Sequence, residues 1–282
     1  MVRIKELDDE GGNHGSGGSI KLNWNPGTNG KSKALAMLST LLLPVLLLGV
    51  QFASAVSPSN TKTSLTLLYQ NNLNASDDVN HISFILLDSF SQKDASAACL
   101  AIGETLLSKS VIQAHKTDFL QSLSYEAYSG RASPLQFYLI KEGVTAIAES
   151  LGTLSFPLLS FSNPQLPVLC TQSSNESQPG TAIVTSKNSI LVASGGNTYL
   201  GYRNLKSFRF LGIPYAETPV RFEYSRPFQG TGKTIDATKY GPQCAQKGSG
   251  DEDCLFVNIQ TPYIPKAGST KKNLRPVMFW SE

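Results

Sequence analysis

Hydrolytic chemistry needs a nucleophile, a base and an acid in one place, and serine is the first residue type to test for it. A nucleophilic serine on a sharp strand-to-helix turn carries the pattern G-x-S-x-G, in which the glycines allow the tight backbone. Ser16, Ser194 and Ser249 come nearest to this pattern, and each lacks a flanking glycine. The sequence therefore assigns no catalytic residue within these 282 residues.

Two glycine-rich strings are similar to binding loops. HGSGG at residues 14–18 is similar to a glycine-rich oxyanion loop, but no strand precedes it, so a linker is the better interpretation. GTGKT at residues 230–234 matches the end of a P-loop, whose first glycine would fall at Pro227. We therefore predict no nucleotide site and no cofactor, and we place GTGKT in a surface turn.

Histidines and cysteines do not form metal-binding patterns. His81 and His115 are isolated in the sequence and are interpreted as ordinary, partly exposed side chains. No two cysteines form a C-x-x-C pair, which argues against a zinc ribbon or a thioredoxin-type motif. The sequence predicts no metal site, and disulfides are possible if the chain leaves the cytosol. The four cysteines are Cys99, Cys170, Cys244 and Cys254.

The composition limits the partners and the state of the chain. A net charge of +3, without a dominant basic block, argues against a nucleic-acid partner. Hydrophobic residues make up 40% and charged residues 16%, which is enough apolar side chain for one or two packed domains. Residues 1–33 are rich in Gly, Asn and Ser, so we expect them to form a disordered tail.

Residues 34–56 indicate in which cellular compartment the rest of the chain lies. They contain no charged residue, and 23 helical residues at about 1.5 Å each are enough to span a hydrocarbon core of roughly 30 Å. Lys31 and Lys33 precede this segment, which by the positive-inside tendency keeps the tail cytoplasmic. The segment is therefore predicted to be a transmembrane anchor, with the C-terminal part lumenal or extracellular.

A cleaved signal sequence is the alternative interpretation of the same segment. Its leucine-rich centre is short, and Ala53, Ser54 and Ala55 form an A-x-A cleavage pattern. Translation from Met37 would give a compact signal sequence, and the chain would be secreted after cleavage behind Ala55. Both interpretations place residues 57–282 in an oxidising compartment.

Residues 57–180 alternate between strand and helix patterns and are expected to form a small mixed α+β domain. Strands are predicted at 63–69, 81–87, 136–140 and 166–171 from their β-branched and aromatic content. Apolar residues at spacings of three and four predict two helices. The first is capped by Asp94 and carries Ala97 to Leu106. The second is capped by Thr117 and ends before Gly130.

A disulfide between Cys99 and Cys170 would join the first of these helices to the last strand. The order of helices, strands and closing strand, with that bridge, is similar to C-type-lectin-like domains, although the lectin calcium site is not visible. Asn74-Ala75-Ser76 and Asn175-Glu176-Ser177 are acceptor sequences for N-glycosylation.

Residues 181–282 begin with short β-rich runs separated by Gly-Asn turns, which predict an antiparallel meander. Four motifs then follow in order: FLGIPYAETPVRF at 210–222, ATKYGPQC at 237–244, DEDCLFVNIQTP at 251–262 and RPVMFW at 275–280. Together they resemble the N-terminal part of type-B carboxylesterases, the family of cholinesterases, fungal lipases and neuroligins.

The resemblance implies an α/β fold, namely the N-terminal portion of an α/β-hydrolase, with the meander and first sheet strands preceded by the mixed domain and one hydrophobic helix. It also implies a serine, activated by histidine and an acidic residue, that attacks an ester carbonyl. After Trp280, where the family continues into an oxyanion loop, only Ser281 and Glu282 follow. We therefore expect no ester hydrolysis by this chain as given, and a small-molecule ester substrate only for a full-length enzyme.

The resemblance further implies two structural pairs. The cysteine of the EDCL motif is bridged to an upstream cysteine in the family, which corresponds to Cys254 with Cys244. An arginine of an R-F pair forms an ion pair with the glutamate before that motif's aspartate, which corresponds to Arg221 with Glu252. Free cysteines and separately solvated charges remain the alternatives, and a partly buried ion pair would be costly to break.

Three functional classes remain open. The first is the serine-esterase lineage, and the second is a non-catalytic relative that serves in adhesion, as neuroligins do. The third is a membrane-tethered binding module in which residues 57–180 matter most. Protein partners cannot be read from the sequence, and membrane contact is expected only through residues 34–56.

Overall fold

The computed structural model describes most of the chain from residue 63 to residue 280. The described residues are 63–70, 74, 76–148, 152–158, 165–178, 180–267, 269 and 275–280. They belong to one compact unit. The predicted tail at 1–33 and the predicted anchor or signal at 34–56 lie outside the described residues. Within the described part of the chain, no helix is long and apolar enough to cross a membrane.

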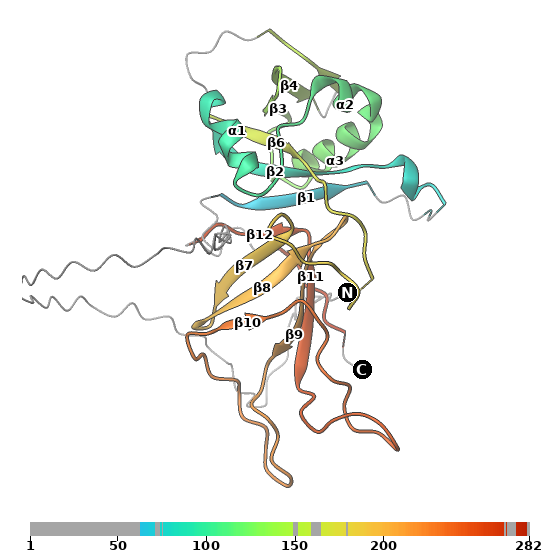
Figure 1. Ribbon diagram of the computed structural model, residues 1–282. Coiled ribbons are helices and arrows are strands. Elements are labelled where there is room, and N and C mark those ends of the chain that lie inside the picture. Colours follow the sequence, from blue (N-terminus) through green and yellow to red (C-terminus); the bar gives the residue numbers. More distant parts are fainter. Residues whose placement is uncertain are drawn as a thin grey trace, which may run out of the picture. The chain divides into compact units, whose positions relative to one another are not determined.

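A seven-stranded mixed sheet forms the first layer, with the strand order β12-β1-β2-β6-β3-β4-β5 (Figure 1). Its neighbours are antiparallel except β3 and β6, which are parallel. The strands are β1 (Leu65–Tyr69), β2 (Ser83–Phe90), β3 (Leu135–Ile140), β4 (Gly143–Ala148), β5 (Thr153–Ser155), β6 (Leu166–Thr171) and β12 (Tyr263–Ile264). The four predicted strands of this region are therefore confirmed, whereas the short β4 and β5 were not predicted.

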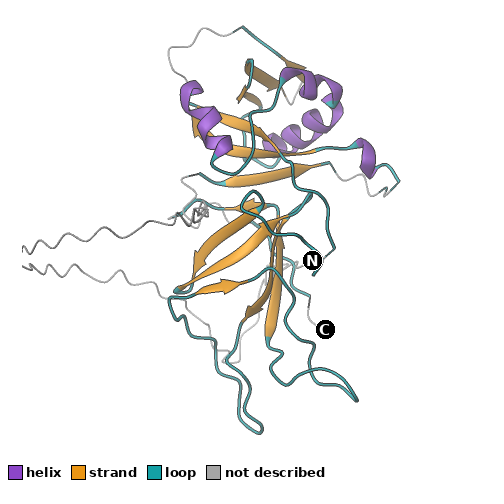
Figure 2. Cartoon of the chain, in the orientation of Figure 1, coloured by secondary structure: helices purple, strands orange, loops and turns teal. Residues whose placement is uncertain are grey.

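All helices of the described residues lie between β1 and β3 in the chain, and Figure 2 shows them in purple. They are the single 3-10 turn η1 (Asp78–Asn80) and the helices α1 (Gln92–Leu100), α2 (Lys109–Ala114) and α3 (Lys116–Tyr128). Helix α1 packs on β6 and β2, and α3 packs on β1, β4 and β5. The sheet and its helices form the mixed α+β arrangement that the sequence predicted.

The predicted ends of the first helix were wrong. Its N-cap is Ser91, whose hydroxyl hydrogen-bonds the Asp94 carboxylate in the first turn. There the carboxylate faces the positive end of the helix dipole. The helix stops at Leu100 because Gly103 turns the chain with a φ of 75°, so Leu106 lies outside it and forms a β-bridge with Cys170.

The second predicted helix is present as α3, and the short helix α2, which the sequence did not predict, precedes it. Ser108 caps α2 by accepting a hydrogen bond from the Val111 amide, at 3.3 Å. His115 then ends α2 and begins α3, so Thr117 lies inside the first turn of α3 and does not cap it. The six-residue α2 carries too little apolar periodicity to be recognised from the sequence.

The second sheet contains the predicted meander. Strands β7 (Ser189–Ser194), β8 (Asn197–Arg203) and β9 (Phe208–Pro214) run antiparallel in succession. Strand β10 (Thr234–Asp236) pairs parallel with β8, and β11 (Phe256–Thr261) pairs antiparallel with β9. The mixed sheets with few helices agree with the fold class expected from the sequence.

One hydrophobic core joins the two sheets. Leu65, Ile85 and Val168 of the first sheet and Phe208 and Phe210 of β9 belong to the same buried cluster. Strand β12 extends the connection, because it follows β11 in the chain but pairs with β1. The domain boundary at residue 180 stays a prediction, while the described residues on its two sides share this core.

Candidate functional site

The carboxylesterase-like motifs meet at Gly212 on β9. The Gly212 amide donates a hydrogen bond of 2.8 Å to the Asn258 side chain of β11. Gly212 has a φ of 65°, and a Cβ atom there would lie 2.5 Å from the Lys239 carbonyl oxygen. Glycine is therefore required for both its conformation and the close approach of the chain. Residues from motifs 210–222, 237–244 and 251–262 thus lie in contact around one position.

A disulfide and an ion pair stabilise the loop before β11. Cys244 and Cys254 are joined, with their Cα atoms 4.8 Å apart. The Arg221 guanidinium donates from Nε to Glu252 Oε1 at 2.8 Å and makes a second bond from Nη2 to the same oxygen. Both pairs that the resemblance implied are thus present in the structure.

The Arg221–Glu252 pair is exposed, so the high cost of breaking a partly buried pair does not apply to it. The two side chains are 75% and 52% exposed. The hydrogen bond from Arg221 lowers the pKa of Glu252 below its ordinary value, and the positive charge adds to this effect. The pair therefore favours the fold at neutral pH and loses this contribution as the pH falls through the Glu252 pKa. Water and salt screen such a pair, so its role in stability is small.

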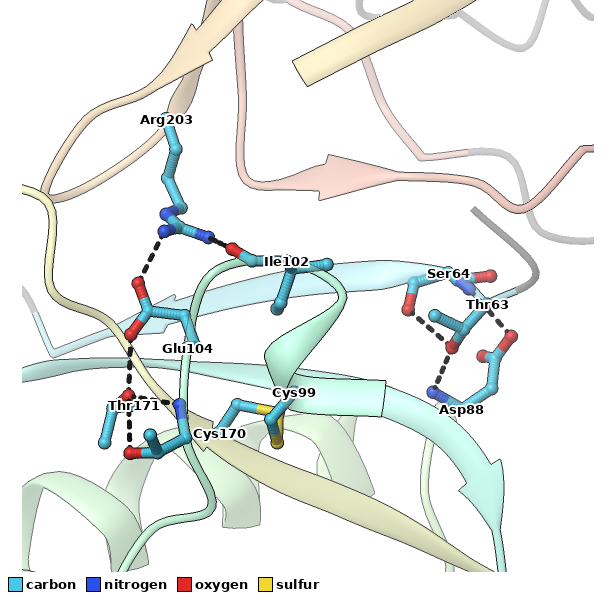
Figure 3. Close-up of a disulfide and its surroundings, with 10 residues drawn as sticks. Thr63, Ser64, Asp88, Cys99, Ile102, Glu104, Cys170, Thr171 and Arg203 are labelled. Atoms are coloured by element: carbon cyan, nitrogen blue, oxygen red, sulfur yellow. Dashed lines mark hydrogen bonds and ion pairs between the residues drawn. A yellow bond between two sulfur atoms is a disulfide. The ribbon is translucent and has the colours of Figure 1, made fainter. Parts of the chain in front are cut away.

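A buried ion pair connects the two sheets, and sequence reasoning missed it. Arg203, at the end of β8, places Nη2 2.5 Å from Oε1 of Glu104, which follows the turn after α1 (Figure 3). The side chains are only 5% and 1% exposed. Thr171 donates to Glu104 Oε2 at 2.6 Å, and the Ser173 amide and hydroxyl donate to Oε1. The carboxylate is therefore fully engaged.

The guanidinium of Arg203 is also held by neutral groups. It donates to the Ser174 hydroxyl at 3.0 Å, to the Ile102 carbonyl at 3.1 Å and to the Lys187 carbonyl at 3.0 Å. Burial lowers the pKa of Arg203, while the nearby Glu104 carboxylate opposes this shift. The only sequence signal was an arginine at the end of an apolar strand, and such a residue is more often solvated.

The Cys99–Cys170 disulfide lies beside this ion pair (Figure 3). It joins α1 to β6, its Cα atoms are 5.6 Å apart, and both residues are fully buried. Cys170 precedes Thr171, whose hydroxyl donates a hydrogen bond to the Glu104 carboxylate. The predicted disulfide therefore anchors the same segment that holds the buried charges.

His81 is not the isolated side chain that the sequence suggested. Its Nδ1 lies 2.7 Å from Asp118 Oδ1 and its Nε2 lies 3.0 Å from Asp77 Oδ2. Asp118 is buried, and His115 Nδ1 approaches its other carboxylate oxygen at 3.6 Å. The hydrogen bond with Asp118 raises the pKa of His81, which partial burial opposes and Asp77 reinforces.

The raised pKa of His81 predicts a pH-dependent stability. The protonated ring is favoured in the folded state, so its contribution is complete below the ordinary pKa of about 6.5 and is lost as the pH rises through the folded-state value. Between pH 8 and pH 6, the free energy of unfolding of the unaltered protein should increase. His81→Gln should flatten this increase in urea titrations, whereas His115→Gln, which removes the more distant ring, should retain most of it. Equal slopes for all three proteins would contradict the assignment.

The described residues do not assemble a hydrolytic triad. Both ring nitrogens of His81 face carboxylates, and no serine hydroxyl is hydrogen-bonded to His81 or His115 among the described residues. Across the same residues, no group of three or more His, Cys, Asp or Glu side chains is placed to hold a metal ion.

The predicted glycosylation sites lie on the surface. Asn74 and Asn175 are exposed, which an acceptor asparagine requires. The Ser76 hydroxyl donates to Asn74 Oδ1 at 2.7 Å, and the Ser177 hydroxyl donates to the buried Asn204 at 3.1 Å. Glycosylation at both positions stays a prediction.

Comparison with known proteins agrees with the motifs. The sequence profile of the carboxylesterase family matches residues 194–281. Esterase E4 of Myzus persicae is 40% identical over 86 residues, which cover 27% of this chain and 15% of the esterase. Carboxylesterase 1D of Mus musculus is 32% identical over 106 residues, which cover 28% of this chain and 18% of the mouse protein. Acetylcholinesterase-1 of Trittame loki is 34% identical over 88 residues, which cover 26% of this chain and 15% of that protein.

A solved structure also matches over a small part of the chain. A thermophilic pNB esterase is 31% identical over 28% of this chain and 19% of its own, with a TM-score of 0.23. The chain spans less than a quarter of the length of these relatives.

Proposed function

We propose that residues 194–281, which match the sequence profile of the carboxylesterase family, carry the N-terminal scaffold of a serine ester hydrolase. The contact of three family motifs at Gly212 supports the proposal most directly, because it shows those motifs forming one packed unit. In this proposal the Cys244–Cys254 bridge and the Arg221–Glu252 pair shape the loop before β11 and do not touch a substrate. A small-molecule ester is the substrate class of the complete enzyme.

Residues 1–282 by themselves do not hydrolyse esters in this proposal. Their sequence contains no G-x-S-x-G motif. A triad and its oxyanion donors supply most of the rate acceleration in serine hydrolases, so we expect no reaction from a sequence without the motif that carries the nucleophile.

Hydrolysis of p-nitrophenyl acetate by the purified 282-residue chain tests this proposal. We expect a rate no greater than that of an equal mass of albumin, and we expect His81→Gln to leave this background unchanged. Turnover above background that an organophosphate abolishes would show a reactive serine and would overturn the proposal. Background that persists after organophosphate treatment would support it.

A non-catalytic, membrane-tethered binding or adhesion module is the second candidate. The buried Glu104–Arg203 pair favours it, because this pair ties the described residues between 63 and 178 to the esterase-like sheet. In this second proposal, residues 34–56 anchor the chain, or are cleaved behind Ala55, and residues 57–282 are lumenal or extracellular. Two disulfides support such an oxidising compartment.

A further inference from the structure

A cavity of about 370 Å³ opens beside β1, and two of its lining residues, Pro262 and Arg275, come from the carboxylesterase-like motifs. Residues 66–70 of β1 and its C-terminal end form one wall, and residues 121–126 of α3 form another. Arg131, Pro262, which lies just before β12, and Arg275 complete the lining. Its size is in the range of small-molecule sites, although none of the predicted site residues lines it.

The charges around this cavity do not balance. Glu126 is 5% exposed at its side chain, and Arg131 holds it with two hydrogen bonds of 2.8 Å. This pair is electrically neutral. Arg275 adds a second guanidinium, and among the described residues no carboxylate lies within ion-pairing distance of it. The described lining therefore carries one uncompensated positive charge.

Arg275 is partly buried without a hydrogen-bond acceptor among the described residues. Its guanidinium stacks over the Tyr263 ring, 4.2 Å from the ring centre. Burial lowers the pKa of Arg275, with the nearby Arg131 acting in the same direction and Glu126 in the opposite one. A partly desolvated guanidinium whose N–H donors have no acceptor among the described residues is a strong site for a planar carboxylate.

Two further polar atoms in the lining lack partners within the described residues. Ser122 is 91% buried, and its hydroxyl makes no hydrogen bond there. The Oε1 atom of Gln70 is also buried and has no donor. Buried polar atoms without partners are uncommon in native proteins, and a ligand hydroxyl or amide can satisfy them.

We propose that this cavity binds a small organic monocarboxylate that has an apolar body and a hydroxyl group. The carboxylate pairs with Arg275 and neutralises the excess charge. Leu68, Tyr125 and Pro262 supply an apolar wall for the body of the ligand, and its hydroxyl reaches Ser122 or Gln70. Inorganic phosphate fits less well, because it leaves the apolar wall uncovered and can bring a second negative charge into a site with a net charge of one.

Isothermal titration calorimetry on the full 282-residue chain tests the proposal with 4-hydroxybenzoate as the probe. The neutral analogue 4-hydroxybenzamide should bind at least about tenfold more weakly, because it loses the charge-assisted hydrogen bonds. Sodium phosphate should likewise bind at least about tenfold more weakly. No binding of 4-hydroxybenzoate, or binding of either comparison probe as tightly as 4-hydroxybenzoate, would overturn the proposal.

Arg275→Gln should lower the affinity for 4-hydroxybenzoate by at least about tenfold, because the variant loses the same charge-assisted hydrogen bonds. Arg226→Gln is the matched control, because Arg226 is an exposed arginine outside the cavity lining that pairs with Glu223. The control should retain the affinity of the unaltered chain. Equal affinities for the two variants would contradict the role of Arg275. If Arg275→Gln fails to fold, the comparison of charged and neutral probes on the unaltered chain still decides the proposal.

Discussion

Replacing Glu104 with Gln should destabilise the fold by about 3–5 kcal/mol, the usual cost of leaving one partner of a buried ion pair uncompensated. The Arg203 guanidinium would stay buried against three neutral oxygens and lose its counter-charge. Arg203→Met should cost a similar amount, because Glu104 would then remain charged and buried. Urea denaturation at neutral pH, monitored by circular dichroism, measures both changes.

A double-mutant cycle separates the ion pair from its surroundings. The variant carrying both Glu104→Gln and Arg203→Met should lose less stability than the sum of the single variants, since neither charge is left alone. Arg221→Gln is the matched control, because it breaks the exposed pair with Glu252 and should leave the denaturation midpoint within error. Additive effects at Glu104 and Arg203, or an equal loss for Arg221→Gln, would show that burial does not set the strength of these pairs.

Replacing Cys99 and Cys170 together with Ala should lower the free energy of unfolding by about 4 kcal/mol. The two residues are 71 positions apart, and a bridge that closes a loop of this length restricts the unfolded chain strongly. Both sulfur atoms are also buried, so their removal leaves unfilled volume in the core and adds to the loss. Urea denaturation under non-reducing conditions measures the change.

The second disulfide supplies the control for this loop-length argument. Cys244 and Cys254 are 10 positions apart in a mostly exposed loop, so replacing both with Ala should cost about 3 kcal/mol or less. A larger loss for this pair than for Cys99 and Cys170 would contradict the explanation. Non-reducing peptide mapping of the unaltered chain, which should join Cys99 to Cys170 and Cys244 to Cys254, must precede the comparison.

The strands could be predicted because their signals are local. The sequence of β6 (Leu166–Thr171) has the β-branched and apolar content of a strand, and its predicted bounds are those in the structure. The hairpin of β7 and β8 has Gly195 and Gly196 at its turn, both with positive φ. Glycine adopts these angles without steric cost, so the turn was visible in the sequence.

The ends of helices and the pairing partners of strands were harder to predict from the sequence. Ser91, Asp94 and Thr117 all have side chains that can cap a helix, and only the surrounding packing selects between them. The neighbour of β11 was equally hard to predict, because β11 pairs with β9 along most of its length. Its partner lies more than 40 positions earlier in the chain, beyond the reach of local patterns.

The resemblance to carboxylesterases could be recognised from the sequence alone, because it rests on the identity and order of motifs such as EDCLFVNI. The same resemblance identified the Cys244–Cys254 and Arg221–Glu252 pairs, and only the structure showed that this ion pair is exposed. The type of a side chain does not determine how exposed its charge is to water. That amount depends on which distant segments pack against it.

The tertiary structure alone decided which charges are buried and which side chains share a cavity. Glu104 and Arg203 are 99 positions apart, and their contact exists only because β8 and the turn after α1 belong to one core. Arg275 and Ser122 line one cavity although 153 positions separate them. Local sequence encodes strand and turn preferences through steric and hydrophobic effects on neighbouring residues, whereas burial and charge pairing result from contacts between residues far apart in the chain.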